Sequence, residues 1–288
     1  MFRFINPGMC VSTGLPVYGK QDVGLTPGGA MDSFSLRCGN ILLGNEEGAP
    51  ALEILFSPEL EWERPGYFVL SGAPTLQSKL KRGNREEAVK HGQVYKFEAG
   101  DVLALGEKHY GMRTYLCYRS AEEMGLENRE GLAMADFNDL ARWPDEDRTI
   151  RVVEGPEFSA LENPEFFFDQ PWTLSHEMSQ MGLRLENNGE GLKVNMGNMV
   201  SEAVATGTIQ LTPKGPIILM KHRQTVGGYP RVFNVISADT DLLGQYGPGQ
   251  KVHFKKVTQD EALAVLRQRE EDIKTLKNQV KYSLEGLM

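Results

Sequence analysis

Residues 216–231 read Pro-Ile-Ile-Leu-Met-Lys-His-Arg-Gln-Thr-Val-Gly-Gly-Tyr-Pro-Arg. The apolar run at the start predicts a buried strand, and the polar residues after it predict a loop that this strand holds in place. Gly227 and Gly228 allow a positive φ and a close backbone approach, and Pro230 fixes the direction in which the chain leaves the loop. Two arginines, an amide and a hydroxyl within ten residues suit a small anionic or amide-bearing ligand. The alternative is a hairpin turn whose arginines are solvated.

Most of the chain consists of short apolar or alternating runs separated by Gly and Pro, which is the pattern of short strands. Regular short strands with few helices predict a barrel or a sandwich. The fold class is therefore predicted as mainly β, with two β-rich halves, a few short helices and a C-terminal helix. The expected strands are residues 51–56, 67–70, 94–97, 101–105, 113–118, 150–153, 182–185, 208–211, 217–220, 232–236 and 251–254.

Three helices interrupt this pattern. The first is expected over residues 32–43, with Asp32 as its N-cap and Gly44 ending it. A second, short helix is expected over 157–161. The third occupies the C-terminal tail, where residues 258–261 have the form of a capping box and apolar residues recur seven apart.

The charge-rich segment 119–148 is interpreted as the connection between the two halves. The expected domains are accordingly an N-terminal β-rich half over 1–145, a barrel half over 146–257 and a C-terminal helix over 258–288.

The composition excludes several classes of function. The chain has 288 residues, 40% hydrophobic and 24% charged, as in an ordinary soluble globular protein. Its net charge of −8 argues against nucleic acids and anionic membranes as partners. No run approaches the roughly 20 apolar residues of a membrane span, and Pro7 and Gly8 break the N-terminus too early for a signal peptide. Together with cysteines that suit reduced thiols, this leads us to expect a cytoplasmic protein. The three cysteines are widely spaced and interpreted as reduced thiols, and the five histidines lack the spacing of metal ligands, so no metal is expected.

Two further clusters have chemical content. The loop 27–31 leads into the helix that Asp32 caps, so its backbone N–H groups can face an anion near the helix N-terminus. The alternative is that Asp32 only caps the helix. Glu202 precedes a Gly-bounded strand that contains Gln210, and a carboxylate at the rim of a barrel can act as a base. An isolated surface glutamate is the alternative, and the chain contains no GxSxG, P-loop or GxGxxG motif.

A series of short motifs follows in a fixed order along the chain. They are QDVG at 21–24, GAMD at 29–32, GN at 44–45, LE at 52–53, EGP at 154–156, MGLRL at 181–185, SE at 201–202, GTIQ at 207–210, LM at 219–220, RQT at 223–225, GGYP at 227–230 and SAD at 237–239. In this order they resemble the KipA family, also known as the C subunit of 5-oxoprolinase. That family is related to the carboxyltransferase region of urea amidolyase and to allophanate hydrolase subunit 2. The resemblance covers roughly residues 10–255.

The resemblance implies a cyclophilin-like β-barrel and a partner, the KipI-like B component of 5-oxoprolinase. With that component and a third one, the A component of lactam-utilisation type, it implies ATP-dependent opening of 5-oxoproline to glutamate. The active site is then expected in the cleft between the halves and at the partner interface. No cofactor is expected on this chain, and ATP is expected to act through the partner subunits. Two alternatives stay open: a carboxyltransferase component that uses carboxybiotin and urea, and a non-catalytic regulator that binds a KipI-like partner.

The predicted catalytic residues are Arg223, Glu202, Asp32 and His222. Arg223 and the backbone of the glycine pair would face the developing oxyanion, and Glu202 or Asp32 would orient the substrate or move a proton. The predicted substrate-binding residues are Gln21, Asp22, Gly29, Met31, Arg184, Gln210, Gln224, Thr225, Gly227, Gly228, Tyr229 and Asp239.

Three positions depart from the pattern of the family. Leu25 and Gln180 stand where the family usually has arginine, and His222 stands where it usually has aspartate. An arginine that binds an anion is not replaced conservatively by either residue. An imidazole at position 222 can transfer protons near neutral pH. We therefore interpret the chain as a divergent member.

Overall fold

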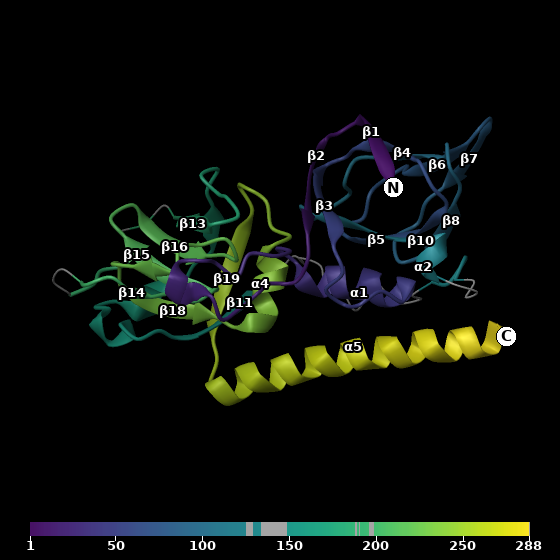
Figure 1. Cartoon of the computed structure of the whole chain (residues 1–288). Helices are drawn as coiled ribbons and strands as arrows, with labels where there is room; N and C mark the ends of the chain where they lie inside the picture. Colours follow the sequence, from purple (N-terminus) through teal and green to yellow (C-terminus); the bar gives the residue numbers. More distant parts are fainter. Residues whose placement is uncertain (125–128, 134–148, 188, 190, 196–198, 288) are drawn as a thin grey trace. The chain divides into compact units, whose positions relative to one another are not determined.

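The computed structural model describes residues 1–124, 129–133, 149–187, 189, 191–195 and 199–287 (Figure 1). The chain divides into two compact units, each assembled from segments that are distant in sequence. The first unit comprises Met1–Leu15, Asp32–Trp143 and Glu270–Met288, and the second comprises Pro16–Met31 and Pro144–Arg269. The domain boundaries expected from the sequence stay a prediction. In the structure, residues 16–31 group with the second unit and the C-terminal helix is shared by both.

The first unit contains two five-stranded antiparallel sheets. One has the order β1-β4-β9-β6-β7, with strands Phe2–Asn6, Glu59–Trp62, Val102–Ala104, Lys79–Arg82 and Arg85–Ala88. The other has the order β2-β3-β10-β5-β8, with strands Met9–Thr13, Ala51–Phe56, Thr114–Ser120, Gly66–Gly72 and Val94–Phe97. Aromatic side chains fill the core, where the rings of Trp62 and Phe97 stack with centroids 3.7 Å apart.

Helix α1, Ser33–Leu43, confirms the first predicted helix. The Asp32 carboxylate accepts a hydrogen bond from the Ser35 backbone at 3.0 Å, so it satisfies an otherwise free N–H group of the first turn. Gly44 ends the helix with a φ of 71°, a left-handed conformation that glycine adopts without a Cβ penalty. Helix α2, Ala121–Met124, follows β10. The remainder of the predicted connection lies mostly outside the described residues.

The second unit is built on a closed barrel with the order β11-β18-β15-β16-β13-β12-β19. Its strands are Thr149–Glu154, Arg231–Val235, Thr208–Thr212, Gly215–Leu219, Gly182–Glu186, Trp172–Leu174 and Lys251–Lys256. The strands β11 and β19 pair in parallel, and the other neighbouring strands of the barrel pair antiparallel. Outside the barrel, β14 (Glu202–Ala203) pairs with β17 (Val226–Gly227). The mainly β class with a barrel in its second half is thus confirmed.

Aromatic rings also fill the barrel. Phe167, at the end of the 3-10 helix η3 (Pro164–Phe167), is fully buried and stacks on Phe233 and Phe254 with centroid distances of 4.5 and 4.4 Å. The unit also contains the 3-10 helix η1 (Gln21–Val23) and helix α4 (Ser237–Leu243).

The short helix predicted over 157–161 is only a 3-10 turn, η2 (Phe158–Ala160). It stops because Leu161 takes an extended backbone and forms a bridge with Val194.

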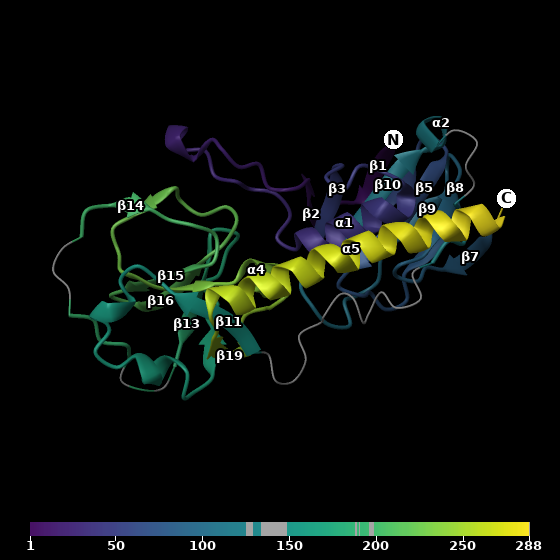
Figure 2. The ribbon, with the colours of Figure 1, turned by 90° about the horizontal axis from the view of Figure 1, so that it is seen from below.

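Helix α5, Gln259–Leu287, confirms the predicted C-terminal helix and its capping box. The Thr258 backbone donates to the Glu261 carboxylate at 2.7 Å, and the Glu261 backbone donates to the Thr258 hydroxyl at 3.2 Å. In the first unit, the part of α5 from Glu270 onward runs along α1, and Glu270 binds Arg37 through two hydrogen bonds of 2.7 Å (Figure 2). Within the described residues, α5 and the shorter helices are too polar or too short to cross a membrane.

Candidate functional site

The polar loop of residues 221–230 leaves the barrel after β16 and returns at β18. Within it, Gly227 pairs with Glu202, and Val226 pairs with Ala203. The Val204 backbone donates to the Thr225 carbonyl at 3.1 Å. The structure therefore brings two of the predicted clusters together along one short antiparallel ladder.

A buried amide lies beneath this ladder. Gln210 is 1% exposed; its Nε2 donates to the Tyr229 carbonyl at 3.2 Å, and its Oε1 accepts from Gln224 at 3.3 Å. A Cβ on Gly227 would lie 2.5 Å from the Nε2 of Gln210. The glycine is therefore needed for a close approach, as expected, whereas the expectation of a positive φ at Gly227 or Gly228 is wrong. The predicted site residues Gln210, Gln224, Gly227 and Tyr229 form one packed group.

Arg223 precedes Gln224 in the loop and is a buried cation. It is 4% exposed, and its Nη2 donates to the Val204 carbonyl at 2.9 Å. Its Nε and Nη1 are buried and have no hydrogen-bond partner among the described residues. Burial lowers the pKa of the Arg223 guanidinium, and the phenol of Tyr18 acts in the opposite direction. Sequence reasoning missed Tyr18, because it lies about 200 positions away from the loop and belongs to none of the motifs.

Lys221 and His222 hold the glycine loop that precedes α1. The Gly28 backbone donates to the Lys221 carbonyl at 3.1 Å, and Lys221 Nζ donates to the Ala30 carbonyl at 2.8 Å. His222 Nε2 lies 3.1 Å from the Gly29 carbonyl. A carbonyl can only accept, so Nε2 carries the proton and Nδ1 is the basic nitrogen of the neutral ring. The predicted residues Gly29 and His222 are thus neighbours, and Lys221, which the sequence reasoning missed, secures the contact.

Two predicted acidic residues are already paired with arginines. Glu202, with more than half of its side chain exposed, lies 2.5 Å from Arg231, which also binds Glu157 at 2.7 Å. Asp239 is buried and accepts from Arg151 at 2.5 and 2.9 Å. These ion pairs fix the loop 201–203 and the start of α4, and they occupy both carboxylates.

The remaining predicted residues lie in different surroundings. Met31 is fully buried in the barrel core. Asp32 belongs to the first unit, where its carboxylate caps α1. Gln21 and Asp22 lie in η1, and Asp22 is exposed. Arg184 donates to the Thr212 hydroxyl at 3.2 Å from the neighbouring part of the barrel.

An apolar pocket of about 570 Å³ adjoins the loop. Gly228, Tyr229 and Pro230 form one wall of this pocket, and the role of Tyr229 in a substrate site stays a prediction. Leu211 and Thr212 of β15 line it too, together with Leu192, Val194 and Met199. Its volume suits a small organic molecule. No group of three metal-ligating side chains occurs within the described parts of the chain.

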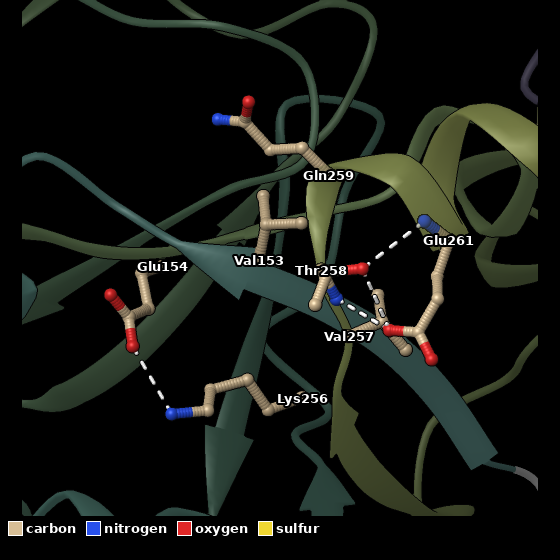
Figure 3. Close-up of a pocket in the computed structure, with 7 residues that line it drawn as sticks. All are labelled: Val153, Glu154, Lys256, Val257, Thr258, Gln259 and Glu261. Atoms are coloured by element: carbon tan, nitrogen blue, oxygen red, sulfur yellow. Dashed lines mark hydrogen bonds and ion pairs between the residues drawn. The ribbon is translucent and has the colours of Figure 1, made fainter.

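A second pocket, of about 430 Å³, lies where β19 meets α5 (Figure 3). Its charged groups have partners within the pocket: Glu154 pairs with Lys256 at 3.1 Å, and Glu261 pairs with Thr258. It contains none of the predicted site residues, so we assign the candidate site to the loop and not to this pocket.

Structural comparison identifies the fold of the chain. The chain is similar to the Kluyveromyces lactis urea amidolyase, with a TM-score of 0.80, 21% identity, and coverage of 96% of this chain and 20% of that one. It is also similar to TTHA0988, with a TM-score of 0.71, 26% identity, and coverage of 88% of this chain and 56% of that one. This chain therefore spans about a fifth of the urea amidolyase and about half of TTHA0988. It has the fold of one part of each protein.

Sequence comparison gives the family. The model of the carboxyltransferase domain, subdomain A and B, matches residues 23–124 and 122–256, and the chain belongs to this family. It is 31% identical to the C subunit of 5-oxoprolinase from Escherichia coli K12, over 85% of this chain and 87% of that protein. It is 27% identical to a putative urea carboxylase of Emericella nidulans, over 87% of this chain and 23% of that protein. The predicted resemblance to the C subunit of 5-oxoprolinase is confirmed at the level of the family.

Proposed function

We propose that this chain is the C-type component of a multi-subunit enzyme that acts on a small amide or lactam, in the ATP-dependent opening of 5-oxoproline to glutamate. The observation that carries the proposal is the buried head of Arg223, with two nitrogens that lack partners among the described residues, in the same loop as Gln224, whose amide donates to Gln210. Such a set of donors suits a substrate rich in carbonyl oxygens. Similarity to the C subunit of 5-oxoprolinase over most of both chains supports the choice of substrate.

The chain's own residues would divide the work as follows. Arg223 donates hydrogen bonds to a negatively charged oxygen of the substrate or of the reaction intermediate, in a site from which water is largely excluded. His222 moves a proton through its basic Nδ1, because Glu202 is paired with Arg231 and Asp32 caps α1. ATP, held by the partner subunits, would supply the energy to open a stable lactam. We propose components of the A and B types as these partners.

The test is reconstitution of the chain with its A-type and B-type partners, with ATP-dependent release of glutamate from 5-oxoproline as the readout. Arg223→Ala should lower kcat/KM by about 10²-fold or more, the usual cost of losing a donor to an oxyanion. Lys214→Ala, at the exposed end of the β15–β16 hairpin, is the matched control. Full activity of the Arg223 variant would refute the proposed role, and no activity of the wild-type complex would refute the proposed reaction.

A second candidate is the carboxyltransferase component of a biotin-dependent carboxylase that acts on a urea-type substrate. The match to a carboxyltransferase family model favours it, as does the similarity to urea carboxylase. In that case carboxybiotin would come from a separate carrier protein. Turnover that avidin abolishes would support this candidate, and turnover that avidin leaves unchanged would exclude it.

A further inference from the structure

We infer that the buried guanidinium of Arg223 binds a carboxylate that is already present on the ligand, so that the ligand of this site is a small anion and not a neutral amide. The inference deepens the proposed function, on which it rests for the choice of probe.

The charge of Arg223 has no counter-charge nearby within the described residues. Among the described residues, burial lowers the pKa of Arg223 and the phenol of Tyr18 raises it. No carboxylate contributes to the pKa of Arg223 among these residues. A guanidinium does not lose its proton in proteins, so the positive charge cannot be relieved by titration. A buried, uncompensated charge is costly, and a bound anion is the direct way to compensate it.

Two other arginines of the same unit have their positive charge balanced by carboxylates. Arg231 binds Glu157 and Glu202, and Arg151 binds Asp239 through two nitrogens. Arg223 is less exposed than either of these side chains, at 4% against 12% and 24%. Arg223 is thus the most deeply buried of these three arginines, and it is the one that has no carboxylate partner among the described residues. This is the arrangement expected when the carboxylate belongs to a ligand.

A hydroxyl supplies a second polar atom on the same stretch of chain. Thr206 Oγ1 is buried and has no hydrogen-bond partner in the described part of the structure. It lies two residues after Val204, whose carbonyl accepts from Arg223. Backbone hydrogen bonds from Gly207 to Leu219, at 2.7 Å, and from Val235 to Gly207, at 2.8 Å, hold this turn in place. A carboxylate has lone pairs for both a guanidinium and a hydroxyl.

The test compares two lactams that differ only in the carboxylate: 5-oxoproline and 2-pyrrolidinone. Their binding to the full chain is measured by calorimetric titration. Hydrogen bonds between charged groups predict that 5-oxoproline binds at least about 10-fold more tightly than 2-pyrrolidinone. Arg223→Leu should abolish this preference, whereas the exposed control Lys214→Met should keep it. Equal binding of the two lactams, a preference that survives in Arg223→Leu, or no binding of 5-oxoproline overturns the inference.

A second measurement needs no ligand. Because Arg223→Leu removes an uncompensated buried charge, the ligand-free variant should melt at the wild-type temperature or above it. A clear fall in Tm would mean that the cation stabilises the folded chain by itself, and it would overturn the inference. Binding that depends on the carboxylate, without turnover in the reconstituted complex, would refute the proposed function alone. Turnover of both lactams at equal rates would refute the inference alone.

Discussion

Replacement of Gly227 by alanine tests whether the backbone of the loop must lie directly on Gln210. The new Cβ would lie 2.5 Å from Nε2 of Gln210 and 3.2 Å from its Cδ and Oε1. Gln210 is 1% exposed and bonded to Tyr229 and Gln224, so its amide cannot move without losing those bonds. Overpacking costs about 1–3 kcal/mol, and a buried amide left unpaired costs about 1–3 kcal/mol.

These two costs overlap, because the amide gives up its bonds in order to relieve the clash. We therefore expect Gly227→Ala to lower the stability of the barrel unit by about 2–4 kcal/mol. For a unit of this size that is roughly 5–15 °C in Tm, measured by scanning calorimetry. Gly228→Ala is the matched control, because its Cβ would meet the Ser201 hydroxyl at 3.2 Å, on an exposed residue that can shift, and the Met199 carbonyl at an ordinary contact distance of 3.7 Å. Replacing glycine by alanine also makes the unfolded chain less flexible, and this effect stabilises both variants equally.

A double-mutant cycle makes the test specific. Gln210→Ala removes the amide that the new Cβ would meet, so Gly227→Ala should cost less in that background by about 1 kcal/mol or more. Equal effects of the two glycine substitutions, or full additivity with Gln210→Ala, would refute the packing argument.

Three further predictions concern the first unit. Asp32→Ala should destabilise it by about 1–2 kcal/mol, because the N-cap bond to Ser35 is lost, while Asp32→Asn should cost less; urea denaturation measures both. Burial lowers the pKa of His91 from 6.5 to about 4, so stability should fall as the pH drops from 6.5 to 4, by about 3 kcal/mol at most, and His91→Gln should remove this pH dependence. Leu276→Ala, at a buried position of α5, should lower the free energy of unfolding by about 2–4 kcal/mol. Leu263→Ala, at a position of α5 that is 47% exposed, should change it little, and equal Tm values for the two variants would contradict the packing of α5.

The strands that were found from the sequence are those with an apolar core face. Strand β5, Gly66–Gly72, is buried along its whole length, and its apolar run was visible. The hairpin of Lys79–Arg82 and Arg85–Ala88 was missed because its residues are mostly charged, and the edge strand β7 is fully exposed. Helix α4 was missed for a related reason, since Ser237-Ala238-Asp239 reads equally well as a loop. Patterns of apolar residues reveal strands that face a core, and they say little about strands at an edge.

The order of the motifs pointed to Gln210, Gln224, Gly227 and Tyr229, which the structure packs into one group, and to Arg223, which binds the Val204 carbonyl. That these residues form a functional site stays a prediction. The same reasoning could not show that Glu202 has Arg231 as its partner, or that Arg223 has no acid beside it among the described residues. Pairing between side chains depends on distances across the barrel, which local sequence does not encode. The proposed catalytic roles stay predictions.

The interleaved make-up of the two units has a consequence for biosynthesis. Residues 16–31 emerge from the ribosome long before the barrel strands with which they group, and the helical residues from Glu270 onward that complete the first unit emerge after those strands. Neither unit can therefore reach its final packing before a segment on the far side of the other unit has been made, although domains generally fold in order from the N-terminus. The first unit would wait, with the side of α1 that receives Glu270 uncovered, until that part of α5 is released.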